Sequence, residues 1–129
     1  MEKNYASLEL CKLAKERGFN WSVRDYYFKD GKINFDTRQF INWNDKKYEN
    51  HEIVSAITYC DLHKWVEEIS DYVININFEI QLFNCSYTIY IKMMDDSEIW
   101  FEEISYKAGF ETREKAFESG FFELFNIWK

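Results

Sequence analysis

The sequence predicts an α+β fold of two layers, in which helices pack on one face of an antiparallel sheet. Segments with apolar residues at helical spacing alternate with segments in which apolar and polar residues alternate one by one. The connections between these segments are short, which favours antiparallel neighbours. The chain has 129 residues, of which 47% are hydrophobic. This length and composition predict a single domain, residues 1–129, with one core.

The first predicted element is a helix over residues 7–17. Ser7 can accept a free backbone N–H of the first turn, as a helix N-cap does. Leu10, Leu13 and Ala14 fall on one face of this helix, and Gly18 stands where helices commonly end in a left-handed turn.

A β-hairpin is predicted after this helix. Residues 23–28 have the composition of a strand, and Asp30-Gly31 is a turn signal. Residues 32–41 can return as the second strand of the hairpin.

The middle of the chain is predicted to form an exposed loop and then a helix. Residues 42–50 are polar and charged apart from Trp43 and Tyr48, which is typical of a loop. Thr58 and Asp61 have the spacing of a capping box. The apolar residues after the box recur at helical spacing, and they are Leu62, Trp65, Val66, Ile69, Tyr72 and Val73.

The pattern then changes to a period of two, which predicts a three-strand meander. In the first strand, apolar residues from Ile74 to Leu82 alternate with polar ones, so one face is expected to be buried. Turns are expected at Asn84-Cys85 and at residues 95–97. The second and third strands are predicted at residues 87–93 and 98–104.

A final helix is predicted after Thr112, which can serve as its N-cap. Its apolar stripe runs from Ala116 to Trp128 and includes Gly120. A glycine inside a helix is unfavourable by about 1 kcal/mol relative to alanine. We therefore expect the helix to cross a strand closely at Gly120.

The net charge of the chain is −7, and it is unevenly distributed. Residues 1–47 carry ten Lys and Arg against seven Asp and Glu, a balance of +3. Residues 48–129 carry six against sixteen, a balance of −10. A negative surface repels phosphate backbones, so direct nucleic-acid binding is not expected.

Localisation is predicted from what the sequence lacks. No apolar run approaches the roughly 18–20 residues that a membrane helix needs. The first residues lack the apolar stretch of a signal peptide. The cysteines Cys11, Cys60 and Cys85 are widely spaced and odd in number, which favours reduced thiols. We expect a cytoplasmic protein that does not associate with membranes.

Three segments resemble small proteins that are common in phages and prophages of Bacteroidota. They are SLELCKLAKERGF (residues 7–19) followed by Asp25-Tyr26-Tyr27, HKWVEE (residues 63–68) before a strand, and FETREKAFESG (residues 110–120) running on to Leu124. The chain departs from that group after Asn42, where a proline-bearing segment is lacking. The resemblance implies a mobile-element origin, and it implies no activity and no functional residues.

Catalytic and metal-binding patterns are sparse in this sequence. The four glycines form no nucleotide-binding loop. Cys60 and His63 have the spacing of half a zinc site, but a closed site needs four ligands. With Asp61 they also form a local Cys–His–carboxylate set, although a core cysteine and a surface histidine are the commoner roles. We expect no catalytic residues, no metal and no cofactor.

Acidic and aromatic residues gather around the predicted turn at residues 95–97. A solvated hairpin tip that protects a sheet edge would explain the acids. However, aromatic residues beside carboxylates on an uncovered sheet face also have the composition of a protein-binding surface. Counting by twos places Tyr90 and Trp100 opposite the face of Tyr87, Ile89 and Ile91. The residues predicted to bind a partner are Asp95, Asp96, Glu98, Trp100, Glu102, Glu103 and Tyr90.

These observations favour a non-enzymatic accessory protein of a phage or related mobile element that binds a macromolecular partner. One concrete form is an inhibitor of a host defence nuclease, such as a CRISPR effector, whose positively charged channel holds nucleic acid. Carboxylates would then stand where phosphates normally lie. Two alternatives stay open. One is a homo-oligomeric module, for example a homodimer, that pairs through the aromatic sheet face, and the other is a small hydrolase that uses Cys60 and His63 or a metal.

Overall fold

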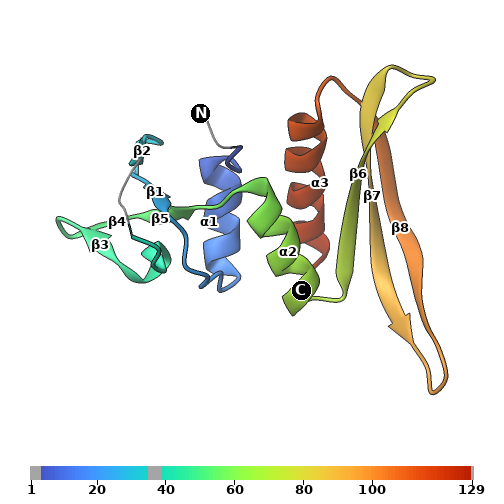
Figure 1. Ribbon diagram of the computed structural model, residues 1–129, viewed down its shortest axis with the longest axis horizontal. Helices are drawn as coiled ribbons and strands as arrows, with labels where there is room; N and C mark the ends of the chain where they lie inside the picture. The colour runs from blue at the N-terminus through green and yellow to red at the C-terminus, as the bar shows by residue number, and fades with distance from the viewer. Residues whose placement is uncertain (1–3, 35–38, 129) are drawn as a thin grey trace. The chain divides into compact units, whose positions relative to one another are not determined.

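The computed structural model describes residues 4–34 and 39–128 and confirms the α+β class (Figure 1). All strand pairs are antiparallel, but the strands form three sheets where the sequence predicts one. The chain divides into two compact units, which we call the N-terminal unit (residues 1–62) and the C-terminal unit (residues 63–129). The single domain predicted from the sequence stays a prediction, and each unit is described by itself.

Helix α1 (Leu8–Glu16) of the N-terminal unit forms as predicted. The Ser7 side chain accepts a hydrogen bond from the Leu10 backbone N–H, with an Oγ–N distance of 3.2 Å. The helix ends before Gly18, whose φ of +92° is the left-handed conformation that glycine adopts without strain. Leu10, Cys11 and Ala14 are fully buried, so the apolar face of the helix faces the core.

The predicted N-terminal hairpin consists of β1 (Asp25–Tyr27) and β2 (Ile33–Asn34). Residues 35–38 of the predicted returning strand lie outside the described residues. The sequence did not predict β5 (Val54–Ala56), which pairs with the other edge of β1 and gives the strand order β2-β1-β5. All three residues of β5 are buried, including Ser55, so neither face of this strand is exposed.

The prediction of a loop over residues 42–50 is wrong in part. This segment holds the 3₁₀ helix η1 (Trp43–Asp45) and β3 (Lys47–Tyr48), and β3 pairs with β4 (His51–Glu52). Asn44 ties the segment to the unit at two points. Its Nδ2 donates to the Phe19 carbonyl at 3.0 Å, and its Oδ1 accepts from the Ser55 N–H at 2.8 Å.

Helix α2 (Tyr59–Ile69) begins where the capping box predicts. The Thr58 hydroxyl accepts a hydrogen bond from the Asp61 N–H at 3.2 Å. Among its apolar residues, Leu62, Trp65 and Val66 are buried.

The C-terminal unit contains the predicted meander, with strand order β6-β7-β8. Its strands are β6 (Tyr72–Glu79), β7 (Asn84–Met94) and β8 (Ile99–Phe110). The first strand ends earlier than predicted, because Ile80 and Leu82 lie in the turn and are 75% and 59% exposed. The predicted turn at Asn84-Cys85 is therefore wrong, since these residues begin β7.

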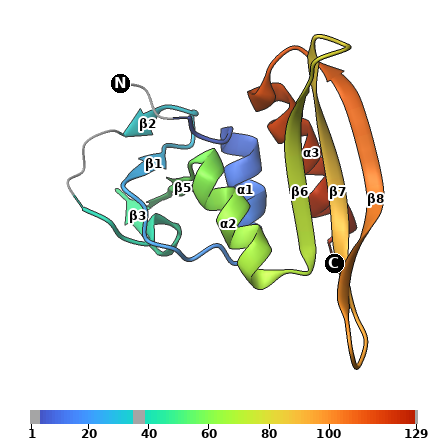
Figure 2. The same cartoon turned by 45° about the vertical axis from the view of Figure 1, so that its right-hand side comes forward.

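Helix α3 (Arg113–Ile127) lies along one face of this sheet (Figure 2). Thr112 caps it by accepting a hydrogen bond from the Lys115 N–H at 3.1 Å. Gly120 lies where the helix crosses β6 and β7, and a Cβ added there would clash with the Ile74 side chain and lie 2.9 Å from Cγ of Tyr87. The close crossing predicted at Gly120 is confirmed.

Candidate protein interface

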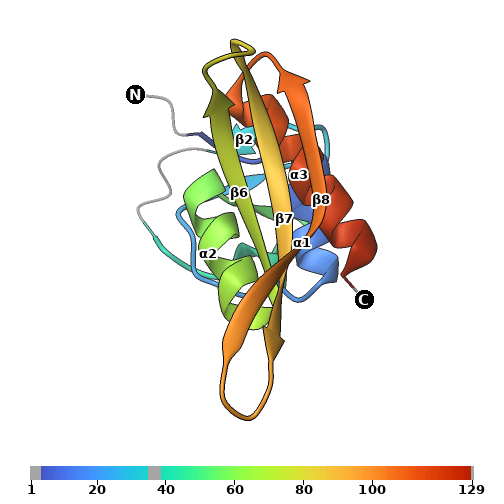
Figure 3. The same ribbon diagram turned by 90° about the vertical axis from the view of Figure 1, so that its right-hand side faces the viewer.

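The β7–β8 hairpin extends beyond the third strand of its sheet. The pairing of β6 with β7 ends at Tyr72 and Ile91, whereas β7 and β8 stay paired as far as Met94 and Ile99. We call residues 90–103 the hairpin arm. Residues 92–101 continue past the end of β6 as a two-stranded segment (Figure 3), and residues 90, 91, 102 and 103 form the base of the arm, where β7 is still paired with β6. The arm contains all the predicted partner-binding residues, and Tyr90, Glu102 and Glu103 lie at its base.

Two β-bulges in β8 determine which residues share a face of the sheet. Ile104 and Gly109 are the extra residues, because the register shifts between Ile89 and Tyr90 and again between Cys85 and Ser86. Gly109 has a φ of +97°, which suits a bulge that requires the left-handed region.

The register assigns the predicted aromatic anchors to opposite faces. Trp100 pairs with Met93, which alternation places on the same face as Tyr87 and Ile89, the face that α3 covers. We call this the helix-side face and the other one the open face. Tyr90 lies on the open face as predicted, so the expectation that Trp100 shares a face with it is wrong.

The two glutamates of the arm are divided in the same way. Glu102 pairs with Ile91 and lies on the helix-side face, where its Oε1 accepts a hydrogen bond from Trp100 Nε1 at 3.2 Å. Glu103 pairs with Tyr90 and lies on the open face. The acidic residues therefore gather on the arm as a whole and not on one face of the sheet.

The tip of the arm is an ordered turn organised by Asp95. Its Oδ1 accepts hydrogen bonds from the backbone N–H groups of Ser97 at 2.9 Å and Glu98 at 2.8 Å. These two N–H groups hold the pKa of the Asp95 carboxyl below its usual range, because they stabilise the ionised form. Asp95 therefore shapes the turn, while the exposed side chains of Asp96 and Glu98 point their charge at solvent.

Large apolar side chains accompany these acids along the arm. Phe101 is 52% exposed and lies on the open face opposite Lys92, and Trp100 is 37% exposed on the helix-side face. Met94 and Ile99 pair with each other next to the tip, and both are exposed. Both faces of the arm thus combine exposed apolar side chains with carboxylates, as protein interfaces do.

A shallow cleft of about 390 Å³ lies at the base of the arm. Phe101 and Lys92 line it from the arm, and Glu67 and Asp71 add two carboxylates. The acidic surface therefore continues from the arm to the end of α2.

The part of the open face next to the β6–β7 turn is more polar and is held by internal hydrogen bonds. Glu79 Oε1 accepts from the Ser86 hydroxyl at 2.8 Å and from the Tyr106 hydroxyl at 3.3 Å. The pKa of Tyr106 is raised by desolvation and then by the neighbouring Glu79 charge. The carboxylate of Glu79 is therefore engaged by hydroxyl groups of the sheet itself.

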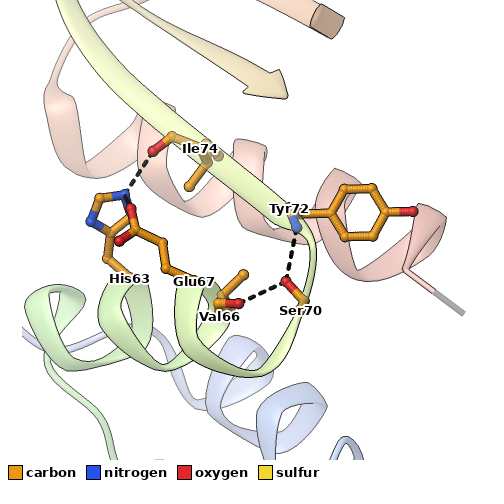
Figure 4. A network of polar contacts seen from close by, with 6 residues as sticks. All are labelled: His63, Val66, Glu67, Ser70, Tyr72 and Ile74. Carbon is orange, nitrogen blue, oxygen red and sulfur yellow. Dashed lines mark hydrogen bonds and ion pairs between the residues drawn. The ribbon is translucent and has the colours of Figure 1, made fainter. Parts of the chain in front are cut away.

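Two side chains that precede β6 in the chain, His63 of α2 and Ser70 after it, form hydrogen bonds with the beginning of this strand (Figure 4). His63 Nε2 donates to the Ile74 carbonyl at 2.7 Å, and Ser70 Oγ accepts from the Tyr72 N–H at 3.1 Å. β8 forms the opposite edge of the sheet, and within the part of the chain that the structure describes no strand pairs with its outer side. An unpaired strand of this length can accept another strand.

The residues of the alternative catalytic hypothesis have the following surroundings. His63 bonds the Ile74 carbonyl, Cys60 is exposed, and the buried Cys11 Sγ accepts from the Ile57 N–H at 3.4 Å. Over residues 4–34 and 39–128, no three His, Cys, Asp or Glu side chains form a group that could hold a metal ion. Within the same residues, no helix is long and apolar enough to cross a membrane.

The net negative charge of the chain comes from the C-terminal unit, because the charges of the N-terminal unit cancel. Residues 1–62 carry ten basic and ten acidic side chains, whereas residues 63–129 carry six and thirteen. The second unit therefore accounts for the full net charge of −7. Comparison of the chain with family models, with curated proteins and with solved structures finds no match.

Proposed function

We propose that this protein is a non-enzymatic binding protein that inserts the hairpin arm into a basic cleft of a protein partner. The observation that carries the proposal is that the arm extends beyond β6 with both faces accessible. Its charged residues are one lysine, Lys92, and five acids, Asp95, Asp96, Glu98, Glu102 and Glu103.

The division of side chains between the faces favours a cleft over a flat surface. Trp100 and Glu102 lie on one face, and Phe101 and Glu103 lie on the other. A flat partner would contact one of these pairs and leave the second exposed, whereas a groove would cover both. Buried aromatic side chains supply much of the affinity in protein interfaces, and complementary charge supplies specificity.

A cleft that normally holds nucleic acid has the required charge. The resemblance to phage proteins supports a partner of this kind, namely a host defence nuclease such as a CRISPR effector. Asp96, Glu98, Glu102 and Glu103 would then occupy positions that phosphates otherwise take, so that the protein competes with nucleic acid without binding it.

Charge reversal on the arm tests the proposal. The tagged protein is used to capture partners from the native host, and a captured protein is then purified for binding measurements with and without nucleic acid. We expect the triple variant Glu98→Lys, Glu102→Lys and Glu103→Lys to lose most of its affinity for that protein, and added nucleic acid to displace the wild-type chain.

A matched control distinguishes the loss of the arm carboxylates from a general change in the net charge of the protein. The variant Glu68→Lys, Glu111→Lys and Glu114→Lys makes the same change of charge at exposed positions outside the arm and the cleft at its base. The proposal is contradicted if the control weakens binding as much as the arm variant does, or if the arm variant binds normally.

A second candidate function is self-association through β8. The unpaired outer side of this strand and the exposed side chains of Ile99, Ile104 and Tyr106 favour it. Light scattering after size-exclusion chromatography measures the mass directly. A monomer at high protein concentration excludes this candidate, and a dimer disrupted by Ile104→Lys supports it.

A further inference from the structure

A surface hollow of about 700 Å³ lies in the N-terminal unit, and the proposed function does not use it. Its volume falls in the range of about 300–1,000 Å³ that is typical of sites for small molecules. The wall consists of α1, Lys29 after β1, the β3–β4 turn together with β4, and Val54 of β5. Four separate parts of one unit therefore enclose the same space.

Three lysines from two of these parts line the hollow. Lys12 and Lys15 are three positions apart on α1 and therefore lie on one side of the helix, and Lys29 follows β1. The Lys15 ammonium donates to the Ile53 carbonyl at 3.1 Å, which fixes its position beside β5. His51 of β4 adds a further nitrogen ligand to the same wall.

The hollow also contains two carboxylates that do not neutralise these lysines. Glu16 and Glu52 line it, yet among the described residues neither forms an ion pair within 4.0 Å with Lys12, Lys15 or Lys29. The site thus offers separate cationic and anionic groups to a ligand. Phosphate groups favour lysine ammonium groups, and carboxylates accept hydrogen bonds from sugar hydroxyls.

From this arrangement we propose that the hollow binds a small hydroxylated phosphate ester, the chemistry that sugar phosphates and nucleotides share. Lys12, Lys15 and Lys29 hold the phosphate. Glu16 and Glu52 accept hydrogen bonds from the hydroxyl groups. No Gly-rich loop contributes backbone N–H groups, so the lysine ammonium groups carry the recognition of the phosphate.

Titration of the full chain tests this site with defined probes. Inorganic phosphate, ribose 5-phosphate, adenosine monophosphate and unphosphorylated ribose are followed by NMR shifts of the N-terminal unit and by calorimetry. We expect saturable binding of ribose 5-phosphate or adenosine monophosphate, weaker binding of phosphate and none of ribose. The preferred ester distinguishes a sugar phosphate from a nucleotide.

Variants on the wall assign the roles. The pair Lys12→Ala and Lys29→Ala should weaken every phosphate probe about tenfold or more, which corresponds to one charged contact or more. Glu52→Gln should weaken ribose 5-phosphate and leave inorganic phosphate unchanged. The pair Lys32→Ala and Lys46→Ala removes the same charge from the unit outside the hollow and should bind like the wild type.

Two results would overturn this site. One is the absence of saturable binding at millimolar probe concentrations by a chain that circular dichroism shows to be folded. The other is equal weakening by the control pair, which would indicate attraction by general charge. The charge-reversal variant of the hairpin arm should bind the probes normally, so failure of this proposal and failure of the proposed function are separate outcomes.

Discussion

Glu102 and Glu103 are adjacent in the chain but lie on opposite faces of the hairpin arm, because Glu102 pairs with Ile91 and Glu103 pairs with Tyr90. A partner that holds the arm in a cleft contacts both carboxylates. A partner on a flat surface contacts only one of them.

Single charge reversals distinguish these two modes of binding. In the proposed mode, Glu102→Lys and Glu103→Lys should each weaken affinity about tenfold, equivalent to about 1.4 kcal/mol. Calorimetry with the purified partner measures this, and Glu114→Lys on α3 serves as the matched control. A loss confined to one of the two variants would show that only one face is bound.

The turn at the tip of the arm should depend on the Asp95 carboxylate. Asp95→Ala removes the acceptor for the Ser97 and Glu98 N–H groups and should speed their amide hydrogen exchange, whereas Asp95→Asn keeps an acceptor oxygen and should slow it again. Asp96→Ala is the control, since the bonds that form the turn come from Asp95.

The same turn should become less stable at acidic pH. Its N–H groups lower the pKa of Asp95 in the folded chain, so the carboxylate stabilises the turn above the unfolded-state pKa of about 3.9. This contribution is lost as the pH falls through the lower folded-state value. An NMR titration of the Asp95 side chain that gives an ordinary pKa would contradict the prediction.

The pair formed by Tyr5 and the buried Asp25 should make the stability of the N-terminal unit depend on alkaline pH. The Tyr5 hydroxyl donates to Oδ2 of Asp25, and Asp25 is only 3% exposed. Burial, and then the hydrogen bond to Asp25, raises the pKa of Tyr5 above its usual value. The unfolded chain ionises Tyr5 at about pH 10, so its contribution is complete below that pH and is lost above it.

Replacement of the hydroxyl tests this pair. Tyr5→Phe leaves a buried carboxylate oxygen of Asp25 without its donor and should lower the free energy of unfolding by about 1–3 kcal/mol at neutral pH. The variant should also lose less stability than the wild type between pH 10 and 11. Tyr48→Phe, at an exposed position, should change neither value, and urea unfolding across this pH range measures both.

The crossing of α3 over the sheet should tolerate no side chain at Gly120. Gly120→Ala improves helix propensity by about 1 kcal/mol, but its methyl group would overlap the side chains of Ile74 and Tyr87. Overpacking of this kind costs about 1–3 kcal/mol, so we expect a net destabilisation in urea unfolding. Asn126→Ala on the exposed side of α3 is the control and should be neutral or stabilising.

The helices that begin with a capping residue could be predicted from the sequence. Ser7, Thr58 and Thr112 each accept the N–H that their positions before a helix predict. β5 could not be predicted, because three residues are too few to establish a period, and Ser55 is buried although it is polar. The early end of β6 was also hidden, since apolar residues continue their alternation into the turn at Ile80 and Leu82.

The residues of the candidate site could be predicted from the sequence, but the face of the sheet on which each of them lies could not. A prediction of faces from alternation follows each strand separately and assumes that paired strands contain no extra residue. Ile104 is such a residue, and its bulge changes the face of every side chain between it and the tip of the arm, including Trp100. Only the pairing with β7 reveals this shift.

The confinement of the net charge to residues 63–129 has a kinetic consequence. A positively charged partner attracts the C-terminal unit from a distance and exerts almost no net pull on the neutral N-terminal unit. Collisions are thereby oriented before contact, and the association rate constant should fall steeply with ionic strength while dissociation changes little. The half of the chain that carries the arm would be steered toward its target first.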